Sequence, residues 1–367
     1  MVHIELSEEL TKIQHSRSGK FYIPSYIKIN NKKYNITSDL SNIESLPRGG
    51  FGLVIFYKYR YKKIAVKFIN ITRLQAVKGS SSVKKAKKEV NLLEQLKNDF
   101  KNNKECKNSI VNYIGYDYFS VNTDKYLLIL LDKMDMDLSD YLIEIQDENT
   151  KLSTAKKIMF QVTKSIQCLH NIGIIYNDMK PDNVLINKKN ANSKLTDFNC
   201  ILKLEEEDYE EYSKSYTGCS TGSYRSPEQV ETAVSYDIKA DSWQLGILFL
   251  CILQKNPRSF ISILSNKYDT EREYFIENIT PRIIDKQLEI CKKKYSELND
   301  DKEYIEMKYL IQGLLAKDKS QRLSINEIIN SGFFRNQRLG KKNKNTKKKS
   351  KISGKKNTSS GFFSNDL

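Results

Sequence analysis

The sequence predicts an α+β fold of two lobes, a small β-rich lobe followed by a larger helical one. Between residues 21 and 131 the apolar runs are mostly short, β-rich and separated by turn residues. After Asp132 longer stretches with helical spacing dominate. The chain has 367 residues, which is enough for two packed lobes and a tail.

The first lobe is predicted from a series of short elements. Residues 1–20 are polar, with a weak helical signal, and residues 21–36 favour a hairpin around Asn30-Asn31. An amphipathic helix is predicted at 83–98, where apolar residues recur at helical spacing. The predicted strands that flank this helix are 41–46, 53–59, 63–69, 111–119 and 126–131.

The second lobe is predicted to be mainly helical. Its predicted helices are 137–146, 153–172, 236–253, 303–316 and 324–330. The expected organisation is therefore an N-terminal extension with a possible hairpin, a β-rich lobe, a helical lobe and a basic tail, at 1–40, 41–132, 133–334 and 335–367.

Composition excludes several classes of protein. Hydrophobic residues make up 39% of the chain, so wholesale disorder is not expected. The longest mostly apolar run, Trp243–Leu253, is far shorter than the ~20 residues of a membrane-spanning helix. The N-terminus does not resemble a secretory signal. Six scattered cysteines without a CxxC pair predict free thiols in a reducing compartment and no zinc site, hence an intracellular protein of the cytoplasm or nucleus.

The C-terminal segment 335–367 carries much of the charge. It contains two Arg and nine Lys against Asp366, which is +10 of the total formal charge of +16. Its Lys, Asn, Ser and Thr lack apolar periodicity, so we expect disorder. Two interpretations stay open: electrostatic contact with nucleic acid or another anionic surface, and a solvated tail without a partner.

A glycine-rich bend lies between two of the predicted strands, in Leu46-Pro-Arg-Gly-Gly-Phe-Gly-Leu-Val54. Glycine allows backbone to approach a phosphate closely, but glycine is common in hairpins, so this signal is weak alone. Lys67 follows at the end of an apolar strand, and Glu89 lies on the next predicted helix. Taken singly, both residues are more typical of a solvated surface.

A second group of polar residues is more specific. Asp178, Lys180 and Asn183 lie on one loop after a long predicted helix, and Asp197 follows at the end of a predicted strand. Two carboxylates, an amide and a lysine supply oxygen ligands for Mg²⁺, a proton acceptor and a cation against phosphate charge. Together with the glycine-rich bend, this set predicts metal-assisted phosphoryl transfer.

These motifs, in this order, resemble those of eukaryotic-type serine/threonine protein kinases over about residues 41–334. The resemblance implies a bilobal kinase fold, ATP and Mg²⁺ as cofactors, and protein substrates. Asp178 would be the catalytic base, Lys180 would lie near the γ-phosphate, and Asn183 and Asp197 would hold Mg²⁺. The residues implied to bind ATP or to position its binding group are Pro47, Arg48, Gly49, Gly50, Phe51, Gly52, Val54, Ala65, Lys67, Glu89, Leu131, Asp132, Met134 and Leu185.

Further residues match structural positions of the family. Ser226-Pro227-Glu228 stands at its APE motif, and Glu228 and Arg322 would form an ion pair. Leu131 would be the gatekeeper of a short hinge. Lys180 with Pro181, and Thr221, favour serine/threonine over tyrosine kinases, with a lean towards the group of cyclin-dependent and SR-protein kinases.

Three positions depart from the family pattern. Pro47 replaces the first loop glycine, which stiffens that corner. Asn177 replaces an arginine that usually pairs with an activation-loop phosphate, so we expect activity without phosphorylation of the available acceptors Ser213, Ser215, Tyr216 and Thr217. Asn199 replaces the glycine of DFG, and asparagine tolerates left-handed backbone better than most residues.

The sequence thus predicts a serine/threonine protein kinase, and the alternative is a weak or inactive pseudokinase acting as a binding scaffold. The acidic run at 205–211 also has two interpretations. It attracts a basic substrate, or its acids pair with the many lysines of the chain itself.

Overall fold

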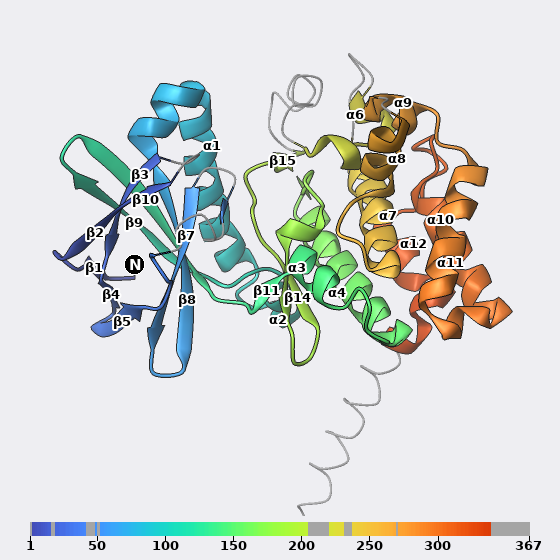
Figure 1. The fold of residues 1–367 in the computed structure, drawn as a ribbon, viewed down its shortest axis with the longest axis horizontal. Helices are drawn as coiled ribbons and strands as arrows, with labels where there is room; N and C mark the ends of the chain where they lie inside the picture. Colours follow the sequence, from blue (N-terminus) through green and yellow to red (C-terminus); the bar gives the residue numbers. More distant parts are fainter. Residues whose placement is uncertain are drawn as a thin grey trace, which may run out of the picture.

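The computed structural model describes residues 2–15, 19–41, 48–49, 52–204, 220–230, 237–268 and 271–338. Within these ranges a β-rich part is followed by a helical part, as the sequence predicts (Figure 1). No helix of the described residues is long and apolar enough to span a membrane.

An eight-stranded antiparallel sheet forms the N-terminal lobe. Its order is β1-β4-β5-β7-β8-β10-β9, and β6 pairs with β7. The strands are β1 Ile4–Leu6, β4 Tyr26–Ile29, β5 Lys32–Ile36, β6 Arg48–Gly49, β7 Gly52–Tyr59, β8 Lys62–Asn70, β9 Tyr113–Val121 and β10 Asp124–Asp132. Strands β1, β4 and β5 of the predicted N-terminal extension therefore join the sheet of the lobe. The predicted strand at 41–46 lies almost wholly outside the described residues.

The two faces of this sheet pack against different partners because side chains alternate along each strand. Phe68 and Leu128 face a core that includes Phe21 and Ile23. Ile69 and Ile129 face the other way, into a core shared with the helix that follows β8. The sheet is thus buried on both sides.

The prediction of a weakly helical segment at 1–20 is wrong. This segment contains β1 and β2 Leu10–His15, and β2 pairs with β3 Gly19–Pro24. Ile13 is buried in the core behind the sheet, and burial of one strand face outweighs a weak local preference. The hairpin at Asn30-Asn31 is present between β4 and β5, and both asparagines have positive φ, as a tight hairpin turn requires.

The helix predicted at 83–98 is part of a longer one, α1 Ile71–Asp99. It begins after Asn70, whose side chain accepts a hydrogen bond from the Arg73 amide at 2.9 Å. Gly79 interrupts it with φ 78° and ψ 176°, so the residues before and after Gly79 form two helical pieces. The second piece carries Glu89 and packs Leu92, Leu93 and Leu96 against the sheet.

The C-terminal lobe is built around α7 Lys239–Gln254, in which almost every side chain is buried. A long helix, α4 Leu152–His170, packs beside it. The other helices are α2 Lys104–Ser109, α3 Leu138–Glu144, α6 Pro227–Val230, α8 Phe260–Tyr268, α9 Arg272–Glu277, α10 Pro281–Lys294, α11 Asp301–Leu314 and α12 Ile325–Asn330. The predicted helices correspond to α3, α4, α7, α11 and α12.

Short strands and turns complete this lobe. A three-stranded sheet has the order β11-β13-β14, and β12 pairs with β15. The strands are β11 Met136–Asp137, β12 Ile174–Ile175, β13 Val184–Asn187, β14 Asn192–Leu195 and β15 Leu202–Lys203. Four 3-10 turns, η2, η4, η5 and η6, cover Pro181–Asn183, Gly222–Tyr224, Ser296–Asn299 and Gly332–Phe334.

The predicted basic tail is described only up to Arg338. Arg338 donates hydrogen bonds to the carbonyls of Ile329 and Ser331, both at 2.7 Å. These first residues of the predicted tail are therefore attached to the helical lobe. The rest of the predicted disordered tail, residues 339–367, lies outside the described part of the chain.

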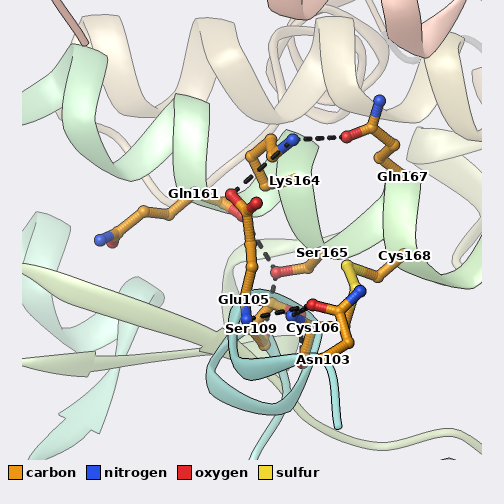
Figure 2. Close-up of a disulfide and its surroundings, with 9 residues drawn as sticks. All are labelled: Asn103, Glu105, Cys106, Ser109, Gln161, Lys164, Ser165, Gln167 and Cys168. Carbon is orange, nitrogen blue, oxygen red and sulfur yellow. Dashed lines mark hydrogen bonds and ion pairs between the residues drawn. A yellow bond between two sulfur atoms is a disulfide. The ribbon is translucent and has the colours of Figure 1, made fainter. Parts of the chain in front are cut away.

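The expectation that all six cysteines are free thiols is wrong. Cys106 in α2 and Cys168 in α4 form a disulfide across 62 residues of sequence (Figure 2). Cys200 is disulfide-bonded as well. Sequence spacing could not reveal the Cys106–Cys168 pair, because the packing of α2 on α4 alone brings the two sulfurs together. Cys251 and Cys291 are free and buried, as small apolar residues.

We expect the Cys106–Cys168 disulfide to stabilise the fold. Without a reductant, Cys106→Ser should lower the free energy of unfolding by about 2–4 kcal/mol. The reason is that the unfolded chain has more conformational entropy when the disulfide does not constrain it. Denaturant unfolding of both proteins with and without dithiothreitol measures this. The difference in the free energy of unfolding between the wild type and Cys106→Ser should be smaller in dithiothreitol. An equal difference with and without dithiothreitol would contradict the prediction.

Candidate active site

The glycine-rich bend is described in part. Gly49 in β6 lies opposite Gly52 in β7. A Cβ atom on Gly52 would lie 2.0 Å from the carbonyl oxygen of Phe68, so no larger residue fits there without a shift of β8. Of Arg48 and Gly49 only the strand is described, and Pro47, Gly50 and Phe51 lie outside the described residues.

Four of the predicted nucleotide-binding residues share one face of the sheet. Val54 lies opposite Lys67, and Ala65 lies opposite Leu131. Residues opposite each other in antiparallel strands project to the same side, and Ala65 and Lys67 are two residues apart. This face is the one that also contacts the shared core of the two lobes.

Of three further predicted residues, Leu185 and Met134 lie near this face and Asp132 does not. Leu185, in β13, is partly buried and packs against the same core as Leu131. Met134 lies between β10 and β11, the connection between the lobes. Asp132 differs, because its carboxylate accepts a hydrogen bond from the side chain of Asn112 at 2.9 Å and falls on the opposite side of β10.

A buried lysine joins three separate segments of the chain. The Lys67 ammonium lies 2.9 Å from Glu89 Oε2 and 3.3 Å from Asp197 Oδ1. Lys67 comes from β8, Glu89 from α1, and Asp197 from the segment after β14. Burial opposes the charged form of Lys67, but Asp197 and Glu89 outweigh it and raise its pKa. The ammonium is thus held charged, with both carboxylates within ion-pair distance.

The loop predicted to be catalytic is organised around Asp178. Its Oδ2 accepts hydrogen bonds from the Lys180 ammonium and from the Asn183 amide, both at 2.8 Å. Its Oδ1 accepts from the backbone and side chain of Thr221 at 3.1 and 2.9 Å. Lys180 also donates to the Thr221 hydroxyl at 2.9 Å. Asp178, Lys180, Asn183 and Thr221 therefore form one polar cluster.

A buried carboxylate on α7 supports the start of this loop. Asp241 accepts hydrogen bonds from the backbone amides of Tyr176 and Asn177 at 2.9 and 2.8 Å, and from His170 at 2.8 Å. Gln244, one turn further along α7, accepts from the Met179 amide at 2.8 Å. The backbone of the loop is thus tied to the central helix of the lobe.

The side chain of Asn177 contacts Cys200 and Gln229. Its side-chain amide donates to the Cys200 carbonyl at 3.1 Å and its oxygen accepts from Gln229 at 2.5 Å. Asn177 has a φ of 66°, a left-handed conformation that asparagine adopts more easily than most residues. The loop is therefore linked to the segment after Asp197 and to α6 without an arginine.

The turn after Asp197 differs in detail from the expectation. Asp197 itself has a left-handed φ of 57°, whereas Asn199 is not among the described residues with positive φ. The substitution at position 199 therefore introduces no left-handed strain.

Asn183 and Asp197 offer the oxygen ligands that Mg²⁺ prefers. The amide nitrogen of Asn183 is bound to Asp178, so its oxygen is directed elsewhere. Only one oxygen of Asp197, Oδ1, is engaged by Lys67. The donor set thus suits a hard cation, although no cluster of three or more His, Cys, Asp or Glu side chains that could hold a metal occurs in the described part of the chain.

The predicted ion pair between Glu228 and Arg322 is present. The guanidinium contacts both carboxylate oxygens, at 2.6 and 3.0 Å, and lies over the Trp243 ring. Both residues are buried, so this pair fixes α6, next to Thr221, on the helical lobe.

Sequence reasoning did not identify three members of this network, His170, Gln229 and Gln244. Each makes its contact through the packing of α4, α6 or α7, and no spacing rule indicates such contacts.

The sequence is also similar to known proteins. A family model described as "Protein kinase domain" matches residues 40–334. "Serine/threonine-protein kinase PLK4" of Nematostella vectensis is 26% identical over 308 residues, which are 83% of this chain and 27% of that protein. "MAP kinase-activated protein kinase 2" of Homo sapiens is 30% identical over 211 residues, 56% of this chain and 48% of that protein.

A third similar protein is "Probable serine/threonine-protein kinase fhkB" of Dictyostelium discoideum, 26% identical over 301 residues, which are 80% of this chain and 23% of that protein. The chain thus spans about a quarter of PLK4 and fhkB and about half of the MAP kinase-activated kinase.

Proposed function

The chain belongs to the protein kinase family, and we propose that it transfers the γ-phosphate of ATP to serine and threonine hydroxyls of protein substrates. The observation that carries this proposal is the Lys67–Glu89–Asp197 contact beside the Asp178 cluster. It supplies a held cation, two metal-ligand side chains and a carboxylate base, which are the parts that phosphoryl transfer requires.

Asp178 would accept the proton of the substrate hydroxyl. Lys180, Asn183 and Thr221 hold its carboxylate in place, and Thr221 shows that a hydroxyl can donate to Oδ1 at 2.9 Å. As the proton moves to Asp178, the hydroxyl oxygen bonds to the γ-phosphorus and the bond between that phosphorus and the ADP oxygen breaks. Lys180 would lie against the charge on the transferred phosphoryl group.

The nucleotide would lie along the shared face of β7, β8 and β10. Val54 and Ala65 would cover one side of the adenine, Leu185 the other, and the segment from Leu131 through Asp132 to Met134 its edge. The bend of residues 47–52 would cover the phosphates, and Lys67 would hold the α- and β-phosphates. Asn183 and Asp197 would hold Mg²⁺, whose positive charge would offset the negative charge of the phosphates.

Asp178→Asn tests the proposal. It should lower the transfer of radiolabelled γ-phosphate from ATP to a generic basic protein by about 10²–10⁴-fold, because an amide cannot accept the proton. The matched control is Asp301→Asn, the same change at an exposed residue of α11, which should keep the wild-type rate.

Thermal melting with ATP and Mg²⁺ completes this experiment. The wild type and Asp178→Asn should both melt at higher temperature when the nucleotide is present. If neither protein transfers phosphate while ATP still raises the melting temperature, the chain is a nucleotide-binding pseudokinase, the alternative that the departures at Pro47, Asn177 and Asn199 raise.

We further propose activity without phosphorylation of the activation loop. Asn177 cannot pair with a phosphate as an arginine would, and its buried amide already bonds to Cys200 and Gln229. These bonds link the catalytic loop to the segment after Asp197 in the absence of a phosphate. The candidate acceptors Ser213, Ser215, Tyr216 and Thr217 lie outside the described residues.

Treatment with a broad-specificity phosphatase, followed by its removal, should leave at least half of the transfer rate. Replacing Ser213, Ser215 and Thr217 by Ala and Tyr216 by Phe should have a similarly small effect. Loss of most of the activity in both experiments, with restoration by a kinase that phosphorylates the loop, would contradict the proposal.

The finer assignments of substrate and location rest on the sequence alone. The acidic run at 205–211, which lies outside the described residues, suits a basic substrate, and the basic tail suits an anionic surface or nucleic acid. The lean towards the cyclin-dependent and SR-protein kinases is not supported by the relatives described above, which bear other names. The sequence-based prediction of a location in the cytoplasm or nucleus depended on free thiols. The disulfide between Cys106 and Cys168 removes that support.

A further inference from the structure

The N-terminal lobe carries lysines on one side of its sheet, on four neighbouring strands. Lys28 of β4 lies opposite Lys33 of β5, and Lys58 of β7 lies opposite Lys63 of β8. Asn35, two residues after Lys33, lies opposite Lys58. The four lysines therefore project to the same side, and the other side of these strands is buried in the core of the lobe.

Most of this charge has no carboxylate partner. Glu5 pairs with Lys28 at 2.8 Å. No carboxylate in the part of the chain that the structure describes lies within ion-pair distance of Lys33, Lys58 or Lys63, and all three side chains are exposed. Like charges directly opposite each other on neighbouring strands are destabilising, so the pair of Lys58 and Lys63 costs stability. An anion bound to both would offset that cost.

A further lysine joins this side of the sheet from the connection between the lobes. The Lys133 amide donates to the Lys63 carbonyl at 3.3 Å, and its ammonium lies 4.4 Å from the centre of the Phe56 ring. Phe56, two positions before Lys58, projects to the same side. Burial and the charge of Lys63 lower the pKa of Lys133, and Asp135 offsets them only in part. The basic face thus consists of Lys33, Lys58, Lys63 and Lys133.

Aromatic side chains lie among these cations. Tyr26 lies opposite Asn35, and the Lys33 ammonium lies 4.0 Å from the centre of its ring. Tyr61, beside Arg60 in the turn between β7 and β8, is 92% exposed (Figure 1). An exposed ring next to cations suits a ligand whose bases stack on aromatic side chains while its phosphates bind the cations.

The exposed ring distinguishes among polyanions. An acidic polypeptide would use the lysines and leave Tyr61 in water. In a duplex the bases are stacked on one another, so their faces are not accessible to Tyr61. A single strand offers both charged phosphates and accessible base faces, and so matches both features of this surface.

We propose that the basic face and Tyr61 bind a single-stranded nucleic acid. The lysines bind phosphates along the sheet, and a base stacks on the ring of Tyr61. This binding requires neither ATP nor phosphoryl transfer, so its failure and the failure of the proposed function are distinguishable.

The test is fluorescence anisotropy with a fluorescein-labelled single-stranded DNA of twelve thymidines, without ATP and over a range of salt concentrations. Lys58→Gln/Lys63→Gln should weaken binding about fivefold or more at low salt. Each phosphate contact adds about 0.7 to the slope of log association constant against log salt, so the slope should become shallower by about 1.4. The control Lys286→Gln/Lys293→Gln, at exposed residues of α10, should change binding less than twofold. All variants keep segment 339–367, so its charge contributes equally to each.

A second pair of variants tests the stacking. Tyr61→Ala should weaken binding about fivefold or more, because a base loses its stacking partner. The matched control Tyr309→Ala, at an exposed residue of α11, should change binding less than twofold. Ultraviolet crosslinking of the same strand with 5-bromodeoxyuridine in place of thymidine, mapped by mass spectrometry, should label Tyr61.

Four outcomes overturn the proposal. These are a loss of binding in Lys58→Gln/Lys63→Gln no larger than in its control, an unchanged salt slope, crosslinks confined to other segments, and tighter binding of a peptide of alternating Glu and Ala that the same variant weakens. Removal of a like-charge pair should not lower the melting temperature. If it does, Lys58→Arg/Lys63→Arg, which keeps both charges, must bind the strand as the wild type does, and a fivefold loss in this variant would also overturn the proposal.

Discussion

The buried contact of Lys67 with Glu89 and Asp197 is the constraint on which the rest of the candidate site depends. An ammonium removed from water needs close anionic partners, and loss of one partner from such a group costs about 3–5 kcal/mol. The partners come from α1 in one lobe and from the segment after β14 in the other. The two ion pairs of the Lys67 ammonium therefore fix α1, the sheet that contains β8 and the predicted metal-binding turn at Asp197 relative to one another.

The second lobe also contains a buried charged group that needs partners, the carboxylate of Asp241. Asp241 is fully buried, but two backbone amides and His170 satisfy it, and Gln244 and Gln229 continue the network to Asn177. Amides have no charge to desolvate, and their contacts are the basis of our proposal of activity without a phosphorylated loop. These contacts tie the backbone of the predicted catalytic loop to the central helix of the lobe.

Motif spacing predicted those residues of the site that lie close together in the sequence or follow one another in the order typical of the family. Glu228 and Arg322 form the ion pair that the resemblance implied, Lys67 contacts Glu89 of the following helix, and Asp178 and Asn183 lie together on the predicted polar loop. The two lobes and most of the helices followed from apolar periodicity. In contrast, the hairpin of β2 and β3 was missed, because Ile13, Phe21 and Ile23 acquire their burial only from the sheet beneath them. The Cys106–Cys168 pair and the contacts of Gln229 and Gln244 depend on helix packing, of which local sequence carries no signal.

The proposed function implies that Glu89 affects catalysis only by holding Lys67. Single-turnover transfer of radiolabelled phosphate, measured for the wild type, Glu89→Gln, Lys67→Met and the double variant, tests it most directly. The account predicts that both single variants are slower than the wild type and that the double variant is no slower than Lys67→Met. Rate losses of the two single variants that multiply in the double variant would show independent roles and contradict the account.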